Sequence, residues 1–256
     1  MHGYLRSALL TTLLLCTSAT ALADDAAPAA PSGPALTGTL GGVSDYLFRG
    51  ISQTDQEPAL QGGVEYGSAD SWYVGIWGSN VSWLSDNSAL GVDVSNSVEV
   101  DVYAGWRIPL NADWKLDLGL YTYYYPGTYP SGFTRPYTTE AYVGISYSIV
   151  TLKYSHAFTN LFAVPDSKHS DYLDLSANWE FVPTWVLNGH VGHQRVKNIG
   201  DASYTDWKLG VTKNFANGIS VALAYYDTNA EEAVYTNGYN DFLARGTGVL
   251  SVTKAF

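Results

Sequence analysis

The histidines in the second half of the chain are the residues whose chemistry is easiest to recognise. His190 and His193 lie three residues apart, a spacing that would let both bind one metal ion if they lay on a helix. On a strand, side chains three positions apart point to opposite faces, so the two imidazoles cannot share an ion without a bulge. Separate polar roles are therefore the better interpretation, and we expect no metal site.

A hydrolytic site is a second possibility, because His193, Ser203 and Asp206 bring an imidazole, a hydroxyl and a carboxylate into one part of the sequence. The nucleophile, the base and the group that orients the base must be joined by hydrogen bonds. Neither a nucleophile elbow nor another diagnostic motif marks these residues. We therefore expect no catalytic residue and no cofactor, and hydrolysis is the least favoured alternative.

Charged side chains form the largest set of candidates, and their arrangement favours transport over catalysis. Acidic and basic residues are interspersed at positions that alternate with apolar ones, as in a barrel whose inner face meets water. The predicted lumen-lining residues are Arg49, Glu99, Asp101, Arg107, Lys115, Asp117, Glu140, Lys153, Asp174, Glu180, Asp206, Lys208 and Arg245. The favoured interpretation is a narrow water-filled pore for small hydrophilic solutes or ions. Its rival is a non-conducting structural or adhesive barrel whose charges pair internally.

The segment from Ser97 to Tyr125 shows which elements would position these side chains. Apolar residues occupy every second position on either side of a turn at 109–113, and charged residues fall between them. Only a strand has a period of two, and each arm has about ten residues, close to the length of a tilted membrane strand. Trp106 and Trp114 flank the turn on the apolar face, as expected at a membrane interface. A soluble sandwich or small barrel is the alternative.

Similar alternation recurs along the chain and predicts about twelve strands. Besides the two arms at 97–125, the predicted strands cover residues 36–49, 59–66, 72–83, 140–147, 150–158, 172–181, 185–194, 207–215, 219–226 and 242–256. Short connections alternate with long ones. This succession predicts an all-β, transmembrane, antiparallel up-and-down β-barrel with short periplasmic turns and longer extracellular loops. The run at 72–83 has aromatic residues on both faces, so its lipid-facing side stays unassigned and a bulge near Gly78 is expected.

Aromatic residues near the predicted connections would form two girdles at the membrane surfaces. The girdle beside the short turns is predicted to contain Trp72, Trp106, Trp114, Trp179 and Trp185. The girdle toward the long loops is predicted to contain Trp83, Tyr124, Tyr225 and Phe242. The 20 tyrosines and 8 tryptophans of the chain are consistent with such girdles.

Composition and the N-terminal sequence indicate export. Residues 1–23 read as a signal peptide, 24–35 as a disordered Ala- and Pro-rich lead, and 36–256 as the barrel. The only cysteine, Cys16, falls within the predicted signal peptide, so no disulfide is expected. The formal charge of -11 argues against nucleic acid as a partner.

Acidic residues dominate the predicted long loops and bear on selectivity. They are Asp55, Glu57, Asp86, Asp93, Asp166, Asp201, Asp227, Glu231 and Glu232. An outer vestibule of this kind would concentrate cations, while a lumen of mixed charge would discriminate only weakly. We therefore expect passive diffusion with a weak preference for cations.

The C-terminal residues resemble the signal by which bacterial outer-membrane barrels are recognised for assembly. Phe256 is the terminal aromatic residue, and Val252 and Leu250 precede it at alternate positions. Lys254 departs from the pattern, but its stem can extend to water at the rim. The resemblance implies a location in the bacterial outer membrane and, as partners, the barrel-assembly machinery, outer-membrane lipid and lipopolysaccharide.

Three motifs carry a resemblance to a known family. They are Ser44–Gln53 (SDYLFRGISQ), Pro58–Val64 (PALQGGV) and Tyr73–Val81 (YVGIWGSNV). With them the sequence resembles the TorF-type porin family of proteobacteria, from about Thr37 through Phe256. The resemblance implies an outer-membrane barrel. That family has no agreed catalytic residues, so it assigns no site to this chain.

Overall fold

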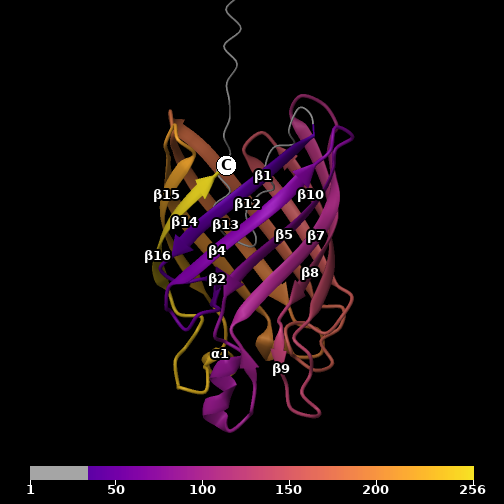
Figure 1. Cartoon of the computed structure of the whole chain (residues 1–256), viewed down its shortest axis with the longest axis vertical. Coiled ribbons are helices and arrows are strands. Elements are labelled where there is room, and N and C mark those ends of the chain that lie inside the picture. Colours follow the sequence, from indigo (N-terminus) through magenta and orange to yellow (C-terminus); the bar gives the residue numbers. More distant parts are fainter. Residues whose placement is uncertain (1–33) are drawn as a thin grey trace, which may run out of the picture.

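The wall of the molecule is one closed antiparallel sheet in the computed structural model, which describes residues 34–256 (Figure 1). Its twelve strands are β1 (Ala35–Val43), β4 (Ala59–Gly67), β5 (Trp72–Asn80), β7 (Val98–Pro109), β8 (Trp114–Tyr124), β10 (Thr138–Tyr147), β11 (Val150–Ala157), β12 (Asp171–Val182), β13 (Trp185–Arg195), β14 (Tyr204–Asn214), β15 (Ile219–Thr228) and β16 (Thr247–Ala255). Consecutive wall strands pair with each other, and β1 pairs with both β4 and β16. The predicted up-and-down barrel is confirmed.

The predicted signal peptide and lead fall almost entirely outside the described residues. Within the lead, Ala35 already belongs to β1. Among residues 34–256, none of the helices has the length and apolar character that a membrane-crossing helix needs.

Alternation along each strand separates an apolar exterior from a polar interior. On β7, for example, Val102 is 49% exposed on the outside, whereas its neighbour Asp101 is fully buried inside. Successive side chains of a strand point to opposite faces of the sheet, so a period of two in the sequence becomes two chemically different surfaces. Every wall strand is between 8 and 12 residues long, which suits a tilted crossing of a bilayer.

The last residues of the chain close the barrel against β1. Phe256 donates its backbone N–H to the carbonyl oxygen of Gly38 at 3.0 Å, and Gly38 returns a hydrogen bond of 2.8 Å to Phe256. The side chains of Leu250, Val252 and Phe256 are exposed on the outer face. The Lys254 ammonium contacts the carbonyl oxygen of Asn217 in a short turn.

Connections between the strands differ sharply at the two ends. Short turns lie at 68–71, 110–113, 148–149, 183–184 and 215–218, and long loops at 44–58, 81–97, 125–137, 158–170, 196–203 and 229–246. The long loops contain β2 (Leu47–Phe48), β3 (Ile51–Ser52), β6 (Ser95–Asn96), β9 (Gly127–Thr128), the 3₁₀ helices η1 (Ser85–Leu90) and η2 (Gly200–Ala202), and α1 (Glu232–Tyr235). They gather at one end of the barrel, opposite the C terminus (Figure 1). The predicted succession of short and long connections is confirmed.

The aromatic girdles are as predicted on one side only. Trp72, Trp106, Trp114, Trp179 and Trp185 are all exposed beside the short turns. On the other side Tyr124 and Tyr225 face outward, but the predictions for Trp83 and Phe242 were wrong, because both pack against buried clusters beneath the loops. Tyr154, Phe158 and Trp207 take the outward positions instead.

Three strand predictions need correction. The register of β5 runs without interruption through Gly78, so the prediction of a bulge there was wrong. The lipid-facing side of this strand, which the sequence left unassigned, carries Trp72, Val74 and Ile76, and Tyr73 faces inward. β1 ends at Val43 rather than at residue 49, and β16 begins at Thr247 rather than at 242. The residues removed from these two strands belong to the long loops. The end of the barrel that carries the long loops is called the outer end below, and these loops the outer loops.

Candidate functional site

Most of the predicted lumen residues do face the interior. Buried or half-buried inside the wall are Glu99, Asp101, Arg107, Asp117, Glu140, Lys153, Asp174, Asp206 and Lys208. Lys115 and Glu180 have the inward parity but are exposed beside the short turns. Arg245 is on no strand and is exposed in the loop at 229–246, so its prediction as a wall residue was wrong.

Arg49 lies inside the barrel for a reason that the strand pattern did not reveal. Residues 44–58, here called the plug, contain the β2–β3 hairpin and fold from the outer end of the barrel into its lumen, where they contact inward side chains of the wall. Arg49 and Gly50 form the hairpin tip with φ angles of 49° and 77°. A Cβ on Gly50 would lie 2.5 Å from Cγ2 of Thr228 and 2.8 Å from Cβ of Asp206, so only glycine fits this tip.

Arg49 anchors the plug to the far wall. Its guanidinium makes a paired contact with the Glu140 carboxylate at 2.7 and 3.1 Å and donates a 2.7 Å hydrogen bond to Oε1 of Gln194. The guanidinium carbon also lies 4.3 Å from the centre of the Tyr172 ring. The Arg49 and Glu140 side chains are only 1% and 2% exposed, so water screens their attraction little.

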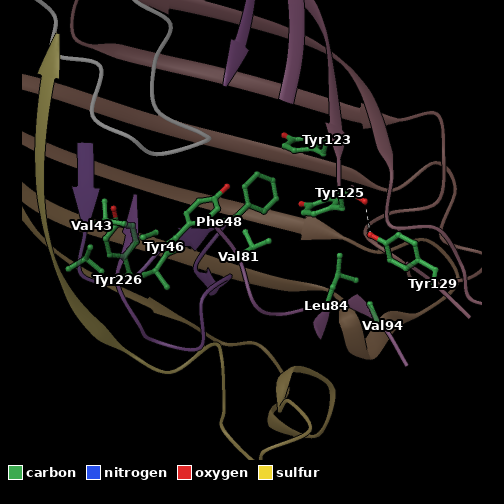
Figure 2. Packing of buried hydrophobic residues seen from close by; sticks show 13 residues of the cluster. Val43, Tyr46, Phe48, Val81, Leu84, Val94, Tyr123, Tyr125, Tyr129 and Tyr226 are labelled. Atoms are coloured by element: carbon green, nitrogen blue, oxygen red, sulfur yellow. Dashed lines mark hydrogen bonds between the residues drawn. The ribbon is translucent and has the colours of Figure 1, made fainter. Parts of the chain in front are cut away.

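Aromatic and aliphatic side chains fill the outer half of the lumen around the plug (Figure 2). The Phe48 ring packs edge-on against Tyr123 at 5.3 Å and against Phe162 at 5.2 Å between ring centres. Tyr46 packs against Trp77 at 5.6 Å. Because these rings come from the plug, from wall strands and from a second outer loop, they join the outer elements into one packed cluster.

Two wall carboxylates lie next to this cluster. Glu99 and Asp101 alternate on β7 and are almost completely buried. The Tyr46 hydroxyl donates to Glu99 Oε1 at 3.4 Å, and the Tyr121 hydroxyl donates to Asp101 Oδ2 at 3.0 Å. Tyrosine hydroxyls from the plug and from β8 thus supply hydrogen bonds that water would otherwise provide.

His190 lies in the lumen between two carboxylates, an arrangement that was not predicted from the sequence. Its Nδ1 lies 2.6 Å from Asp174 Oδ2 and its Nε2 lies 2.9 Å from Asp206 Oδ2. The Tyr172 hydroxyl donates to the other oxygen of Asp206 at 3.0 Å. Inward parity on β13 could have identified His190, but only the register of neighbouring strands brings Asp174 and Asp206 to its two nitrogens.

The prediction that His190 and His193 point to opposite faces of the sheet is confirmed, and the alternative of a hydrolytic site is wrong. His193 faces outward and its Nδ1 lies 2.9 Å from the Thr205 hydroxyl, not near Ser203. Asp206 points into the lumen on the opposite face of the sheet. The Ser203 hydroxyl accepts the backbone N–H of Val196. The proposed nucleophile, base and acid therefore never meet.

A second ionic network crosses the half of the lumen toward the short turns. Arg107 makes a paired contact with Glu65 at 2.5 and 2.9 Å, and its guanidinium carbon lies 3.7 Å from the Tyr73 ring centre. The Tyr73 hydroxyl donates to Asp117 at 2.7 Å and also contacts the Tyr142 hydroxyl. Glu65 and Tyr73 were not among the predicted candidates, although their positions alternate correctly.

The interior contains a small cavity on the side formed by β13 to β16. This cavity of about 20 Å³, lined by Lys208, Thr212 and Tyr226 among others, has room for about one water molecule. In the plug, burial raises the pKa of the Asp45 carboxyl, and hydrogen bonds from Ser52 and Thr54 oppose this rise. Within residues 34–256 no group of three or more histidine, cysteine, aspartate or glutamate side chains is arranged to hold a metal ion.

A closed wall that is apolar outside and charged inside defines a transmembrane β-barrel of the bacterial outer-membrane class. Within that class the chain belongs to the family described as "Bacterial protein of unknown function (Gcw_chp)", whose model matches residues 26–256. A comparison with curated proteins finds no match.

Solved porins share the fold. The KdgM porin aligns with a TM-score of 0.55 and 7% sequence identity, over 86% of this chain and 98% of the porin. A KdgM porin in complex with disordered oligogalacturonate aligns with a TM-score of 0.53, 7% identity and coverage of 86% and 97%. The NanC porin gives a TM-score of 0.50, 11% identity and coverage of 87% and 99%. At such identities the similarity concerns the fold alone.

Proposed function

We propose that this protein is an outer-membrane porin for passive diffusion of small hydrophilic solutes or ions, and that the plug closes it in the conformation described above. The observation that supports this proposal is the charged interior, which continues from Lys115 near the short turns to Glu99 at the outer end. Charged groups inside a membrane protein are costly unless they pair or meet water, so they commonly mark a solute pathway.

The plug is suited to act as a movable closure. Its β2–β3 hairpin pairs with no wall strand, so displacement of the hairpin leaves the twelve-stranded sheet intact. Both ends of the plug are held next to each other, because Val43 and Ala59 are register partners in β1 and β4. The hairpin can therefore move while the wall keeps its strand pairing. Ser44, the first residue of the plug, stays attached to β16 because its backbone N–H donates to the carbonyl oxygen of Leu250 at 2.9 Å.

An excess of carboxylates supports weak cation selectivity. The interior carries Glu65, Glu99, Asp101, Asp117, Glu140, Asp174 and Asp206 against Arg49, Arg107, Lys153 and Lys208. The oligogalacturonate named with one KdgM porin is an anion, so we do not transfer that solute to this chain. Small neutral solutes and cations fit the interior charge better.

The partners of the proposed porin are those of an outer-membrane barrel. They are the barrel-assembly machinery, which would read Phe256, Val252 and Leu250, together with outer-membrane lipid and lipopolysaccharide around the apolar exterior. The resemblance to the TorF-type porin family agrees with this assignment and stays a prediction. No enzymatic role is proposed, because the histidine and serine that suggested one lie apart.

A non-conducting structural barrel is the second candidate, and the burial of the plug favours it. Tyr46, Ser52 and Thr54 are each at most 3% exposed, and Arg49 has buried partners on the opposite wall. If these contacts never break, the lumen stays closed and the internal charges serve only to hold the barrel together.

Planar-bilayer conductance of two forms separates the candidates. In the first form the chain is intact, and in the second a two-residue Asn-Gly turn replaces residues 44–58 and joins Val43 to Ala59, which are already paired. A matched control shortens the loop at 196–203 and leaves the plug in place. We expect brief, infrequent openings from the intact chain and the control, and a steady conductance without the plug.

Two results would contradict the proposal. Silence of the plug-free barrel, with its heat-modifiable gel mobility retained, would favour the structural barrel. Equal conductance with and without the plug would show that residues 44–58 do not close the pore.

A further inference from the structure

Two histidines meet on the outer face of the barrel wall. His156 is the penultimate residue of β11, and His169 lies in the loop at 158–170 that follows this strand. Their Nε2 and Nδ1 atoms, respectively, lie 3.1 Å apart. The two residues are thirteen positions apart, so sequence spacing gave no reason to pair them.

The fold fixes the His156 imidazole and the backbone of His169. Nδ1 of His156 lies 2.5 Å from Oδ1 of Asp171, its register partner on β12. His169 donates its backbone N–H to the carbonyl oxygen of Ala157 at 3.0 Å and accepts a 3.2 Å hydrogen bond from Arg195 at its own carbonyl oxygen. Arg195 also contacts Asp171, whose charge offsets the guanidinium next to the histidines.

The contact with Asp171 determines which nitrogen of His156 is available. The Asp171 carboxylate accepts a hydrogen bond from Nδ1–H, so Nε2 of a neutral His156 keeps its lone pair, which faces His169. A carboxylate behind an imidazole is the usual arrangement around histidines that bind metals, because it orients the ring and increases its basicity. His169 can present a second lone pair from Nδ1 by moving its proton to Nε2.

The distance between the two nitrogens suits one metal ion. Zn²⁺ and similar ions bind imidazole nitrogen at about 2.0–2.1 Å, so two such bonds at near-tetrahedral angles place the nitrogens about 3.3 Å apart. The His156 side chain is 30% exposed and His169 is exposed, so water molecules can complete the coordination. The ion would approach from the outer end of the barrel, where β11 ends and β12 and the loop begin.

We propose that His156 and His169 bind one divalent transition-metal ion on the outer rim of the barrel, with Asp171 as a positioning residue for His156. The site lies on the outer face of the wall and is independent of the plug and of transport. Two imidazoles and water favour Cu²⁺ and Ni²⁺ over Mg²⁺ and Ca²⁺, which prefer oxygen ligands.

Titration of the untagged, refolded barrel with Ni²⁺ and Cu²⁺ tests the site. Isothermal titration calorimetry should give one equivalent of bound metal for the wild type, and electron paramagnetic resonance of bound Cu²⁺ should show coupling to two imidazole nitrogens. His156→Gln and His169→Gln should each abolish the single-equivalent binding. Asp171→Asn should weaken affinity about 10–100-fold with both nitrogens still coordinated.

His193→Gln is the matched control, because this third outward histidine of the rim contacts Thr205 and no other imidazole. It should leave the affinity and the spectrum unchanged. Absence of binding by the wild type would overturn the proposal, as would unchanged binding in His156→Gln or an equal loss in His193→Gln. Gel mobility and β-rich circular dichroism of each variant ensure that a loss reflects the site and not the fold.

Discussion

Replacement of Arg49 by glutamine should release the plug. The substitution removes the charge that pairs with Glu140 and leaves that carboxylate buried without a cation. Removal of one partner from a buried ion pair costs about 3–5 kcal/mol, largely because the remaining charge is unpaired. With the plug released, Glu140 faces water, so nearly all of this cost falls on the closed form. At about 1.4 kcal/mol per factor of ten, the ratio of closed to open barrels should fall by about a hundredfold to a few thousandfold.

Single-channel recording in planar bilayers measures this ratio directly. Arg49→Gln should open far more often than the wild type, at an unchanged single-channel conductance if the plug leaves the lumen in both. The double variant Arg49→Gln, Glu140→Gln should recover part of the closure, because neither charge is then left buried alone. Arg135→Gln is the control, since Arg135 is an exposed loop cation over the Tyr129 ring. An open probability for Arg49→Gln equal to that of the control would refute the reasoning.

Three further expectations concern pH, assembly and selectivity. Burial raises the pKa of Asp45 in the closed plug, so the closed form binds the proton more tightly than a released plug. Acidification should therefore favour closure, and Asp45→Asn should flatten this pH dependence of the open probability. Phe256→Ser should lower the yield of heat-modifiable barrel in outer membranes, and a normal yield would argue against the terminal assembly signal. Neutralisation of Glu231 and Glu232, both exposed, should weaken the cation preference that reversal potentials measure at low salt. At physiological salt, exposed charges more than about 8 Å apart are largely screened, so the cation preference of the wild type should already be weaker there.

The wall of the barrel could be predicted from the sequence because the bilayer constrains it on one side and the lumen on the other. Outward positions such as Val102 are apolar and inward positions such as Asp101 are polar. The residue types of a strand therefore indicate which of its two faces meets lipid. The charged residues of the wall were assigned to the correct face for the same reason. Parity does not say which side chains meet, and the contacts of His190 and Arg107 depend on register between strands.

The contacts of Arg49 and the contact between His156 and His169 could not be predicted from the sequence for a different reason. Glu140 and Gln194 are separated from Arg49 by 91 and 145 residues, and only the closure of the barrel and the inward fold of the plug bring them together. His156 and His169 are closer in sequence, but their contact depends on how the loop at 158–170 returns to β12. Local pattern gives no information on either arrangement.

Residues 44–49, the first part of the plug, were mistaken for part of β1, since they continue the alternation of that strand. Asp45 and Arg49 share the inward parity of Val43, while Tyr46 and Phe48 would have been acceptable at a membrane interface. Length is what distinguishes the two structures. The predicted strands at 36–49 and 242–256 are the longest of the set, and the observed wall strands of 8 to 12 residues show that both exceed what a crossing needs. A run of alternation longer than a crossing therefore indicates that its excess residues belong to a loop. At 242–246 the loop stays at the end of the barrel, and at 44–49 it folds into the lumen.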